Sequence, residues 1–269
     1  MQIKNKFLNF DGFFFDCDGV IWEGNDLLPG AKALITYLIE THKQIAFLSN
    51  NSTQSVADYQ KKFLSFDLPV SEEQIMTSSL VTLNYVEHKN YKTKSIYVLG
   101  EEGLKDTFRK AGFNVLPDSG TQENVDAVIV GMDRSFTYQK LSIGLKYCLK
   151  GADFIGTNPD PQFPTPDGFF PGAGSMIGAL QSALGYGPEK ICGKPDPLMA
   201  TIMLERFDLK PERTLMIGDR VITDLYFAVN ANISPILVKT GFGKEELNKY
   251  PNFQYFYVLD SLTDLFNQN

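Results

Sequence analysis

The stretch GFFFDCDGVIWEG, residues 12–24, places three phenylalanines directly before two aspartates that are one residue apart. The apolar run is typical of a buried strand. Asp16 and Asp18 stand where that strand should end, although two neighbouring carboxylates repel each other. In a parallel sheet covered on both faces, ligands bind outside the carboxyl ends of the strands. We therefore interpret Asp16 and Asp18 as lying at the edge of a ligand cleft.

Other short apolar runs end in the same way, with polar residues directly after them. They are IAFL (45–48), TLMI (214–217) and PILV (235–238). Amphipathic stretches such as residues 29–43 lie between the runs and have the spacing of a helix with one apolar face. Uninterrupted apolar strands that alternate with helices predict an α/β fold with a Rossmann-like, doubly wound parallel-sheet core.

The middle of the chain contains a second set of strand candidates, SIYVLG (95–100), VDAVIVG (125–131) and ADFIGTN (152–158). They alternate with helical patterns and predict a second α/β unit of ordinary domain size. We place this inserted domain at residues 79–189, between the two parts of a core domain at 1–78 and 190–269. The segment TNPDPQFPTPDGFFPGAGS (157–175) is rich in Pro and Gly and predicts a long, shaped loop.

Composition excludes several classes of protein. The 269 residues carry a formal charge of -7, with a pI near 5.0, which argues against a nucleic-acid partner. The three cysteines form no CxxC pair, which favours a reducing compartment. Every apolar run is shorter than the roughly 18 residues that suggest a membrane span. We expect a cytoplasmic protein with no membrane partner.

Four motifs occur in order, each at the end of a predicted strand or in a loop. They are DCDGV (16–20), SNN (49–51), GKPDP (193–197) and GDR (218–220), the last followed by Thr223 and Asp224. Together they resemble the motifs of the haloacid dehalogenase superfamily in its phosphatase branch. Within that branch the chain is most similar to the NagD, 4-nitrophenylphosphatase and phosphoglycolate phosphatase-like group, from about Phe13 to Gly243.

The resemblance implies a Mg²⁺-dependent phosphatase that hydrolyses small phosphomonoesters through an aspartyl phosphate. Phosphoryl transfer needs a nucleophile in line with the leaving group and positive charge near the phosphoryl oxygens. By resemblance, Asp16 is the nucleophile and a metal ligand. Asp18 offers its backbone carbonyl to the metal, and its carboxyl group acts as general acid and then general base, for which we expect partial burial. Dehalogenases lack an aspartate at the position of Asp18.

The other site residues are also assigned by resemblance. Ser49, Asn50 and Asn51 would bind the substrate, and Lys194 would neutralise phosphoryl oxygens, with Ser49 and Lys194 counted as catalytic. Asp219 would complete the metal site. Asp224 would orient Lys194 or a metal-bound water, and whether it binds the metal directly is open. The candidate metal residues are Asp16, Asp18, Asp219 and Asp224.

The spacing of the motifs resembles that of relatives with a C2-type cap. Only 31 positions separate Asp18 from Ser49, whereas 145 separate Ser49 from Lys194, where the inserted domain fits. Residues 20–30 would form a flap, with Trp22 covering the site. Related proteins pair through the cap, which implies a homodimer. Pyridoxal phosphatases carry a histidine where this chain has Phe163, which argues against pyridoxal phosphate and makes Phe163 a candidate substrate contact.

Alternatives remain at this point. A non-catalytic phosphate-binding or regulatory module would use the same residues without turnover, and a glycosyltransferase would use Asp16 and Asp18 to bind a nucleotide sugar. A cysteine phosphatase is rejected because its CxxxxxR loop would need arginine where Glu23 stands, and we expect Cys17 to be packed away from the cleft. Phosphoglycolate, glycerol phosphate, sugar phosphates and nucleotides all remain candidate substrates.

Overall fold

The structure is a computed structural model that describes residues 3–120, 124–165 and 167–267. The chain divides into two compact units. The first comprises Met1–Ser49, Val56–Met76 and Lys194–Asn269, and the second comprises Asn50–Ser55 and Thr77–Gly193. We describe each unit by itself.

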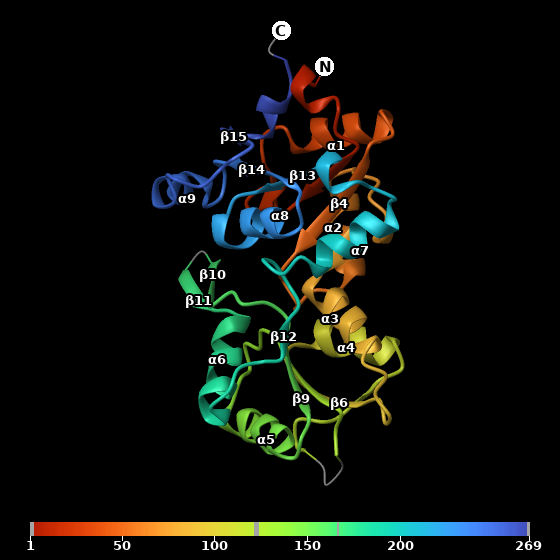
Figure 1. The fold of residues 1–269 in the computed structure, drawn as a ribbon, viewed down its shortest axis with the longest axis vertical. Coiled ribbons are helices and arrows are strands. Elements are labelled where there is room, and N and C mark those ends of the chain that lie inside the picture. The colour runs from red at the N-terminus through yellow and green to blue at the C-terminus, as the bar shows by residue number, and fades with distance from the viewer. Residues whose placement is uncertain (1–2, 121–123, 166, 268–269) are drawn as a thin grey trace. The chain divides into compact units, whose positions relative to one another are not determined.

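The first unit is built on a six-stranded sheet in the order β15-β14-β13-β1-β4-β5, which is parallel in every pairing from β15 to β4 (Figure 1). Its strands are β1 (Gly12–Phe15), β4 (Gln44–Ser49), β5 (Ile75–Thr77), β13 (Thr214–Gly218), β14 (Ser234–Val238) and β15 (Tyr257–Leu259). The motif-bearing strands β1, β4 and β13 are therefore direct neighbours, and their carboxyl ends share one edge.

Helices cover both faces of this sheet. They are α1 (Ala31–Glu40), α2 (Val56–Ser65), α7 (Leu198–Arg206), α8 (Tyr226–Asn230) and α9 (Gly243–Lys249). Shorter elements are η1 (Asn5–Phe7), η2 (Glu72–Gln74), η3 (Pro211–Arg213), the π turn η4 (Val221–Leu225), η5 (Leu262–Leu265) and the hairpin β2 (Trp22–Glu23) with β3 (Asp26–Leu27).

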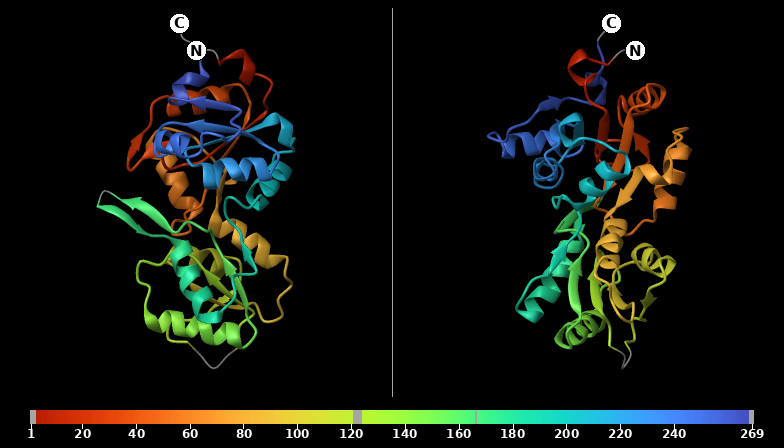
Figure 2. Two further views of the ribbon diagram at one scale, coloured as in Figure 1. Left: turned by 60° about the vertical axis from the view of Figure 1, so that its left-hand side comes forward. Right: turned by 45° about the vertical axis from the view of Figure 1, so that its right-hand side comes forward.

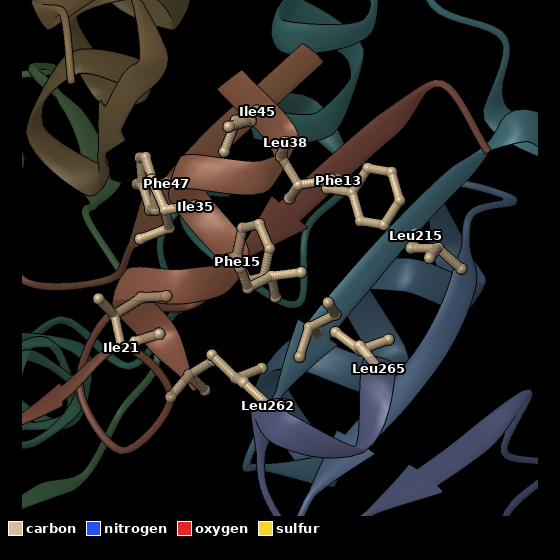
Figure 3. Packing of buried hydrophobic residues seen from close by; sticks show 14 of the residues in the cluster. Phe13, Phe15, Ile21, Ile35, Leu38, Ile45, Phe47, Leu215, Leu262 and Leu265 are labelled. Carbon is tan, nitrogen blue, oxygen red and sulfur yellow. The ribbon is translucent and has the colours of Figure 1, made fainter. Parts of the chain in front are cut away.

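Alternation along β1 explains why three consecutive phenylalanines are buried. Phe13 and Phe15 join a core cluster with Ile35 and Leu38 of α1, and Figure 3 shows these side chains on one face of the sheet. Phe14 points to the opposite face and is equally inaccessible. Both faces of the strand are thus covered, as expected for a strand in a parallel sheet.

The second unit has a five-stranded parallel sheet in the order β12-β9-β8-β6-β7. Its strands are β6 (Ser95–Leu99), β7 (Asn114–Val115), β8 (Ala127–Val130), β9 (Asp153–Gly156) and β12 (Lys190–Ile191). Its helices are α3 (Ser78–Glu87), α4 (Glu102–Lys110), α5 (Tyr138–Leu149) and α6 (Ala173–Leu184).

The Pro- and Gly-rich segment differs from the prediction. We expected a long loop, whereas β10 (Gln162–Thr165) and β11 (Gly168–Pro171) form an antiparallel hairpin. Figure 2 shows this hairpin standing apart from the five-stranded sheet of its own unit. A hairpin of this length can form here because Gly168, with φ of +114°, adopts a backbone conformation that other residues rarely accept.

The unit boundaries also differ from the predicted domain boundaries at 78/79 and 189/190. Residues 50–55 group with the second unit although they directly follow β4. Hydrogen bonds explain this grouping, since Ser78 Oγ donates to the carbonyl of Asn50 and Ser79 Oγ donates to that of Ser52. Among the described residues, no helix combines the length and the apolar character needed to cross a bilayer.

Candidate active site

Asp16 and Asp18, after the end of β1, differ in burial and in their hydrogen-bond partners. The backbone of Asp16 continues the strand pairing, since its N–H donates to the carbonyl of Ile217 at 2.9 Å. The side chain of Asp16 is 15% exposed, whereas Asp18 is exposed, so the partial burial expected for Asp18 is not found. Cys17, between them, is fully buried in the core, as predicted from strand alternation.

Lys194 links two of the predicted site residues. Its ammonium nitrogen lies 2.6 Å from Oδ1 of Asp16 and 2.6 Å from Oδ1 of Asp224, and it also donates to the carbonyl of Leu48 at 2.9 Å. Burial alone lowers the pKa of Lys194, but the two carboxylates outweigh this effect and raise its pKa above the ordinary value. The buried amine is therefore a cation held at the end of β1.

Asp219 follows β13 and is almost fully buried. Its Oδ2 accepts a hydrogen bond from the backbone N–H of Phe242 at 2.8 Å. Its Oδ1 is buried without a hydrogen-bond partner. A buried carboxylate oxygen without a hydrogen-bond partner destabilises the fold unless it binds a proton or a cation.

Two glycines make room for the Asp219 carboxylate. A Cβ added to Gly19 would lie 2.4 Å from Asp219 Oδ2, and one added to Gly241 would lie 2.2 Å from the same oxygen. Both glycines also have positive φ, +82° and +53°. Thr240 Oγ1 donates to the carbonyl of Gly19 at 2.6 Å and holds the two loops together. Only glycine fits at these positions beside Asp219.

Asp16, Asp219 and Asp224 form a carboxylate cluster in which one oxygen of each lies within 4.8 Å of the others. Burial raises the pKa of Asp16 to about 7, even though Lys194 acts in the opposite direction. Burial, together with the other two carboxylates, also raises the pKa of Asp219. The cluster has more negative charge than Lys194 alone compensates, and its donors are oxygens. These residues therefore fit a hard divalent cation.

Asp18 is not part of this cluster. Its carboxylate Oδ1 instead accepts a hydrogen bond of 2.9 Å from the indole N–H of Trp22. The use of its backbone carbonyl as a metal ligand stays a prediction. Trp22 itself was expected to cover the site as part of a flap. That prediction is wrong, because Trp22 is 1% exposed and packs inside the first unit.

The SNN motif is divided between the two units. Ser49 ends β4, is 3% exposed, and shares a hydrogen bond of 2.6 Å with the hydroxyl of Tyr59. In the second unit, Asn50 Nδ2 donates to Asp160 at 3.0 Å, and Asn51 Oδ1 accepts from both the backbone N–H and the hydroxyl of Thr53. Both asparagines thus shape local loops in that unit, and their contact with a substrate stays a prediction.

Phe163 lies on β10 of the second unit. Its ring packs edge-on against that of Phe170, with centroids 6.3 Å apart. The two rings are a cross-strand pair of the β10–β11 hairpin. The structure thus gives Phe163 a packing partner within the hairpin, and its role toward a substrate stays a prediction.

Comparisons with known proteins now identify the family. A profile described as haloacid dehalogenase-like hydrolase matches residues 13–114, and one described as HAD-hydrolase-like matches residues 191–265. The chain is 34% identical over 255 residues to 5'-nucleotidase YutF of Bacillus subtilis, with 95% of this chain and 97% of that protein covered. The chain belongs to the haloacid dehalogenase-like hydrolases. The family membership predicted from the four motifs is confirmed.

Other members of the haloacid dehalogenase-like hydrolases agree with this placement. An acid sugar phosphatase of Staphylococcus haemolyticus is 33% identical, with 94% of each chain covered. The solved structure of a 4-nitrophenylphosphatase from Thermotoga maritima superposes with a TM-score of 0.89 at 32% identity, covering 97% of this chain and 98% of that one. The predicted α/β fold class is confirmed.

Several residues at the site of this haloacid dehalogenase-like hydrolase were not predicted. They are Tyr59, which shares a hydrogen bond with Ser49, Trp22, which donates one to Asp18, and Gly241, which lies beside Asp219. All three lie outside the four motifs, and Trp22 was predicted to have a different role. The sequence offers only a weak signal for these residues. An aromatic residue with a polar group, or a glycine, is common near any motif. Only the folded backbone brings them to the site residues.

Proposed function

We propose that the protein is a Mg²⁺-dependent phosphatase that hydrolyses small phosphomonoesters through an aspartyl phosphate on Asp16. The observation that carries the proposal is the arrangement around Lys194 in the first unit. One ammonium group contacts Asp16 and Asp224, while Asp219 adds a buried oxygen that no protein donor satisfies. A nucleophilic carboxylate, a fixed cation and a cation-binding cluster are the parts that phosphoryl transfer requires.

Asp16 is the nucleophile in this proposal. Its carboxylate attacks phosphorus, the bond from phosphorus to the ester oxygen breaks, and an acyl phosphate forms on the Asp16 side chain. Water then attacks that phosphorus, the bond from phosphorus to the Asp16 oxygen breaks, and inorganic phosphate leaves while the Asp16 carboxylate is restored. Lys194 is held next to Asp16, so its charge offsets the negative charge of the incoming phosphate and of the transition state.

Asp18 moves the proton in both steps. Its carboxyl group gives a proton to the departing ester oxygen, and the resulting carboxylate takes a proton from the attacking water. Asp18 follows β1 and is not part of the carboxylate cluster, so its carboxyl group is available for this role. Ser49, at the end of the adjacent strand, is proposed to donate a hydrogen bond to a phosphoryl oxygen.

The divalent cation would be held by Asp16 and Asp219, together with the backbone carbonyl of Asp18, and Asp224 would orient Lys194. Mg²⁺ suits these ligands because it prefers oxygen donors and is usually bound by one or two carboxylates together with the phosphate of a substrate. When bound, it supplies positive charge that lets an anionic substrate approach an anionic nucleophile.

The substrate class is proposed to be small phosphorylated metabolites. Relatives named 5'-nucleotidase, acid sugar phosphatase and 4-nitrophenylphosphatase support phosphomonoesters with varied leaving groups. Asn50, Asn51 and Phe163 are proposed to contact the substrate. The acidic overall charge continues to argue against nucleic acid. A cytoplasmic location and a homodimer through the second unit stay predictions.

The test is phosphate release from a panel of phosphorylated metabolites and 4-nitrophenyl phosphate, with Mg²⁺ or with EDTA. Wild-type protein should turn over several substrates only with Mg²⁺. Asp16→Asn should lower kcat by about 10⁴-fold or more, since a nucleophile is lost. Mass spectrometry of acid-quenched wild-type reactions should find phosphate on Asp16.

Asp26→Asn is the matched control because Asp26 is exposed on β3 and belongs to no part of the proposed site. It should retain wild-type kinetics. Undiminished turnover in Asp16→Asn would refute the nucleophile assignment. Stable phosphate on Asp16 without release would instead identify the protein as a non-catalytic phosphate-binding or regulatory module.

A further inference from the structure

The carboxylate of Asp18 has a specific donor from the first unit, the indole N–H of Trp22. The distance from Trp22 Nε1 to Asp18 Oδ1 is 2.9 Å. Asp18 is exposed, whereas Trp22 is 1% exposed, so a solvent-exposed carboxylate accepts from a buried donor. An exposed aspartate alone would populate several rotamers, and a hydrogen bond from a fixed donor selects one of them.

A tight turn after β1 sets the position of the indole. The backbone N–H groups of Ile21 and Trp22 both donate to the carbonyl of Cys17, at 2.9 and 3.3 Å. In return, Gly19 N–H donates to the carbonyl of Trp22 at 2.8 Å. Gly19 accepts the positive φ that the turn requires. The turn thereby folds the chain back so that Trp22 lies beside Asp18, four residues earlier.

Helix α2 and the residue that follows it, Phe66, pack against the indole ring. The Trp22 ring packs against Phe63, with centroids 4.8 Å apart, and against Tyr59 and Phe66 at 6.1 and 6.2 Å. The Lys62 ammonium lies 4.1 Å from the centre of the same ring and also donates to the carbonyl of Gly24. A ring packed in this way has no room to change rotamer.

We propose that Trp22 is a positioning residue that holds the Asp18 carboxyl group in place for proton transfer. The inference rests on the proposed function, because it assigns Trp22 a role in the step that Asp18 performs. It also names the reactive atom. An indole N–H can only donate, so Asp18 Oδ1 must accept, and the transferable proton is carried by Oδ2.

The consequence for substrates follows from the chemistry of the leaving group. When the phosphorus–oxygen bond breaks, an alkyl ester leaves as a strongly basic alkoxide and needs the proton from Asp18. A 4-nitrophenyl ester leaves as a stable phenolate and needs it much less. A correctly placed general acid contributes about 10²- to 10⁴-fold. Loss of positioning should therefore slow phosphoryl transfer from alkyl phosphates more than from 4-nitrophenyl phosphate.

The hydrogen bond can be tested without activity because the chain contains a single tryptophan. Protein labelled with ¹⁵N-tryptophan should give one indole N–H resonance with slow solvent exchange. Asp18→Ala should shift that resonance and speed its exchange, whereas Asp26→Ala should leave both unchanged. An indole resonance that does not respond to Asp18→Ala would overturn the proposal.

The kinetic test compares Trp22→Phe, which keeps an aromatic ring but removes the donor, with Phe63→Leu, which trims the same cluster and keeps the donor. Trp22→Phe should lower kcat/KM for an alkyl phosphate by about 10-fold or more, with a several-fold smaller loss for 4-nitrophenyl phosphate. Phe63→Leu should not change the ratio between the two substrates. Equal losses for both substrates in Trp22→Phe would show a merely structural role and overturn the proposal.

A double-mutant cycle separates this inference from the proposed function. In an Asp18→Asn background, Trp22→Phe should add no further selective loss, because the group that it positions has already been removed. A full additional loss in that background would overturn the inference while leaving the phosphatase intact. Wild-type protein that hydrolyses neither substrate would refute the proposed function itself, and the indole resonance would still report whether Trp22 contacts Asp18.

Discussion

Lys194 donates a hydrogen bond of 2.6 Å to Asp16, although the two residues are 178 positions apart in the chain. The same nitrogen contacts Asp224 at an equal distance. The contacts join three of the four motifs in the first unit and leave Lys194 only 1% exposed. A buried cation shared by two carboxylates makes both the stability and the chemistry of the site depend on one side chain.

Replacing Lys194 should destabilise the first unit. Lys194→Met leaves two buried carboxylates without their cation, and the free energy of unfolding should fall by about 3 kcal/mol or more. Adding Asp224→Asn should recover part of this loss, because one uncompensated charge is removed. Urea unfolding followed by Trp22 fluorescence measures both values, since the only tryptophan of the chain lies in that unit.

Lys239→Met is the matched control. Lys239 also lies 2.7 Å from a carboxylate, that of Asp260, but the pair is exposed. Its removal should cost less than about 1 kcal/mol. Equal effects of the two lysine substitutions would contradict the buried-charge explanation.

Gly19 should be essential for binding the cation. An alanine there has a positive φ and places Cβ against Asp219 Oδ2, so Gly19→Ala should displace the carboxylate and weaken Mg²⁺ binding by about 10-fold or more. Isothermal titration measures the dissociation constant. Gly24→Ala is the control, since Gly24 also has a positive φ, of +56°, but no atom within 4 Å of an added Cβ. Comparable weakening by both substitutions would show that backbone strain, not the Asp219 contact, is responsible.

Tyr59 should support Ser49 from behind the site. Tyr59→Phe removes the hydroxyl that lies 2.6 Å from Ser49 Oγ in a buried environment, which should cost about 1 kcal/mol of stability. Ser49 would then hold a phosphoryl oxygen less well, and KM should rise. Thermal unfolding and steady-state kinetics check the two effects, with Tyr186→Phe, an exposed tyrosine, as the control. Unchanged KM would mean that Tyr59 serves packing alone.

Stabilisation by Mg²⁺ should increase with pH. Burial raises the pKa of Asp16 from 3.8 to about 7. Between these two pH values, the metal-free folded state therefore keeps a proton on Asp16 that the unfolded state has released. The stability that this raised pKa contributes is complete below pH 3.8 and is lost as pH rises through about 7. A cation competes with that proton, and its binding should therefore stabilise the protein more at about pH 8 than at about pH 5.5.

Melting temperatures with Mg²⁺ and with EDTA across this range give the measurement. Asp219→Asn should abolish the difference between the two conditions at every pH. A Mg²⁺ effect of the same size at both ends of the range would contradict the assignment of Asp16 as a ligand that competes with a proton.

Patterns within a few residues predicted much of this molecule. The phenylalanines before Asp16 identified a strand buried on both faces, because only a covered strand tolerates such a run. The polar residues after the β1, β4 and β13 strands identified the edge that carries the site. The hairpin around Phe163 was missed, since Pro and Gly predict turns without showing whether the residues beside them pair.

The sequence by itself determined which chemical groups are available. It also determined that Asp16, Ser49 and Asp219 lie at strand ends and that Lys194 lies in a loop before a helix, because strand periodicity and motif order are local properties. Only the tertiary structure decided their partners. Trp22 reaches Asp18 through a turn, and Tyr59 reaches Ser49 from helix α2. Lys194 enters from a segment that follows the whole second unit. These contacts depend on how distant elements pack to bury apolar surface, and no spacing along the chain encodes that result directly.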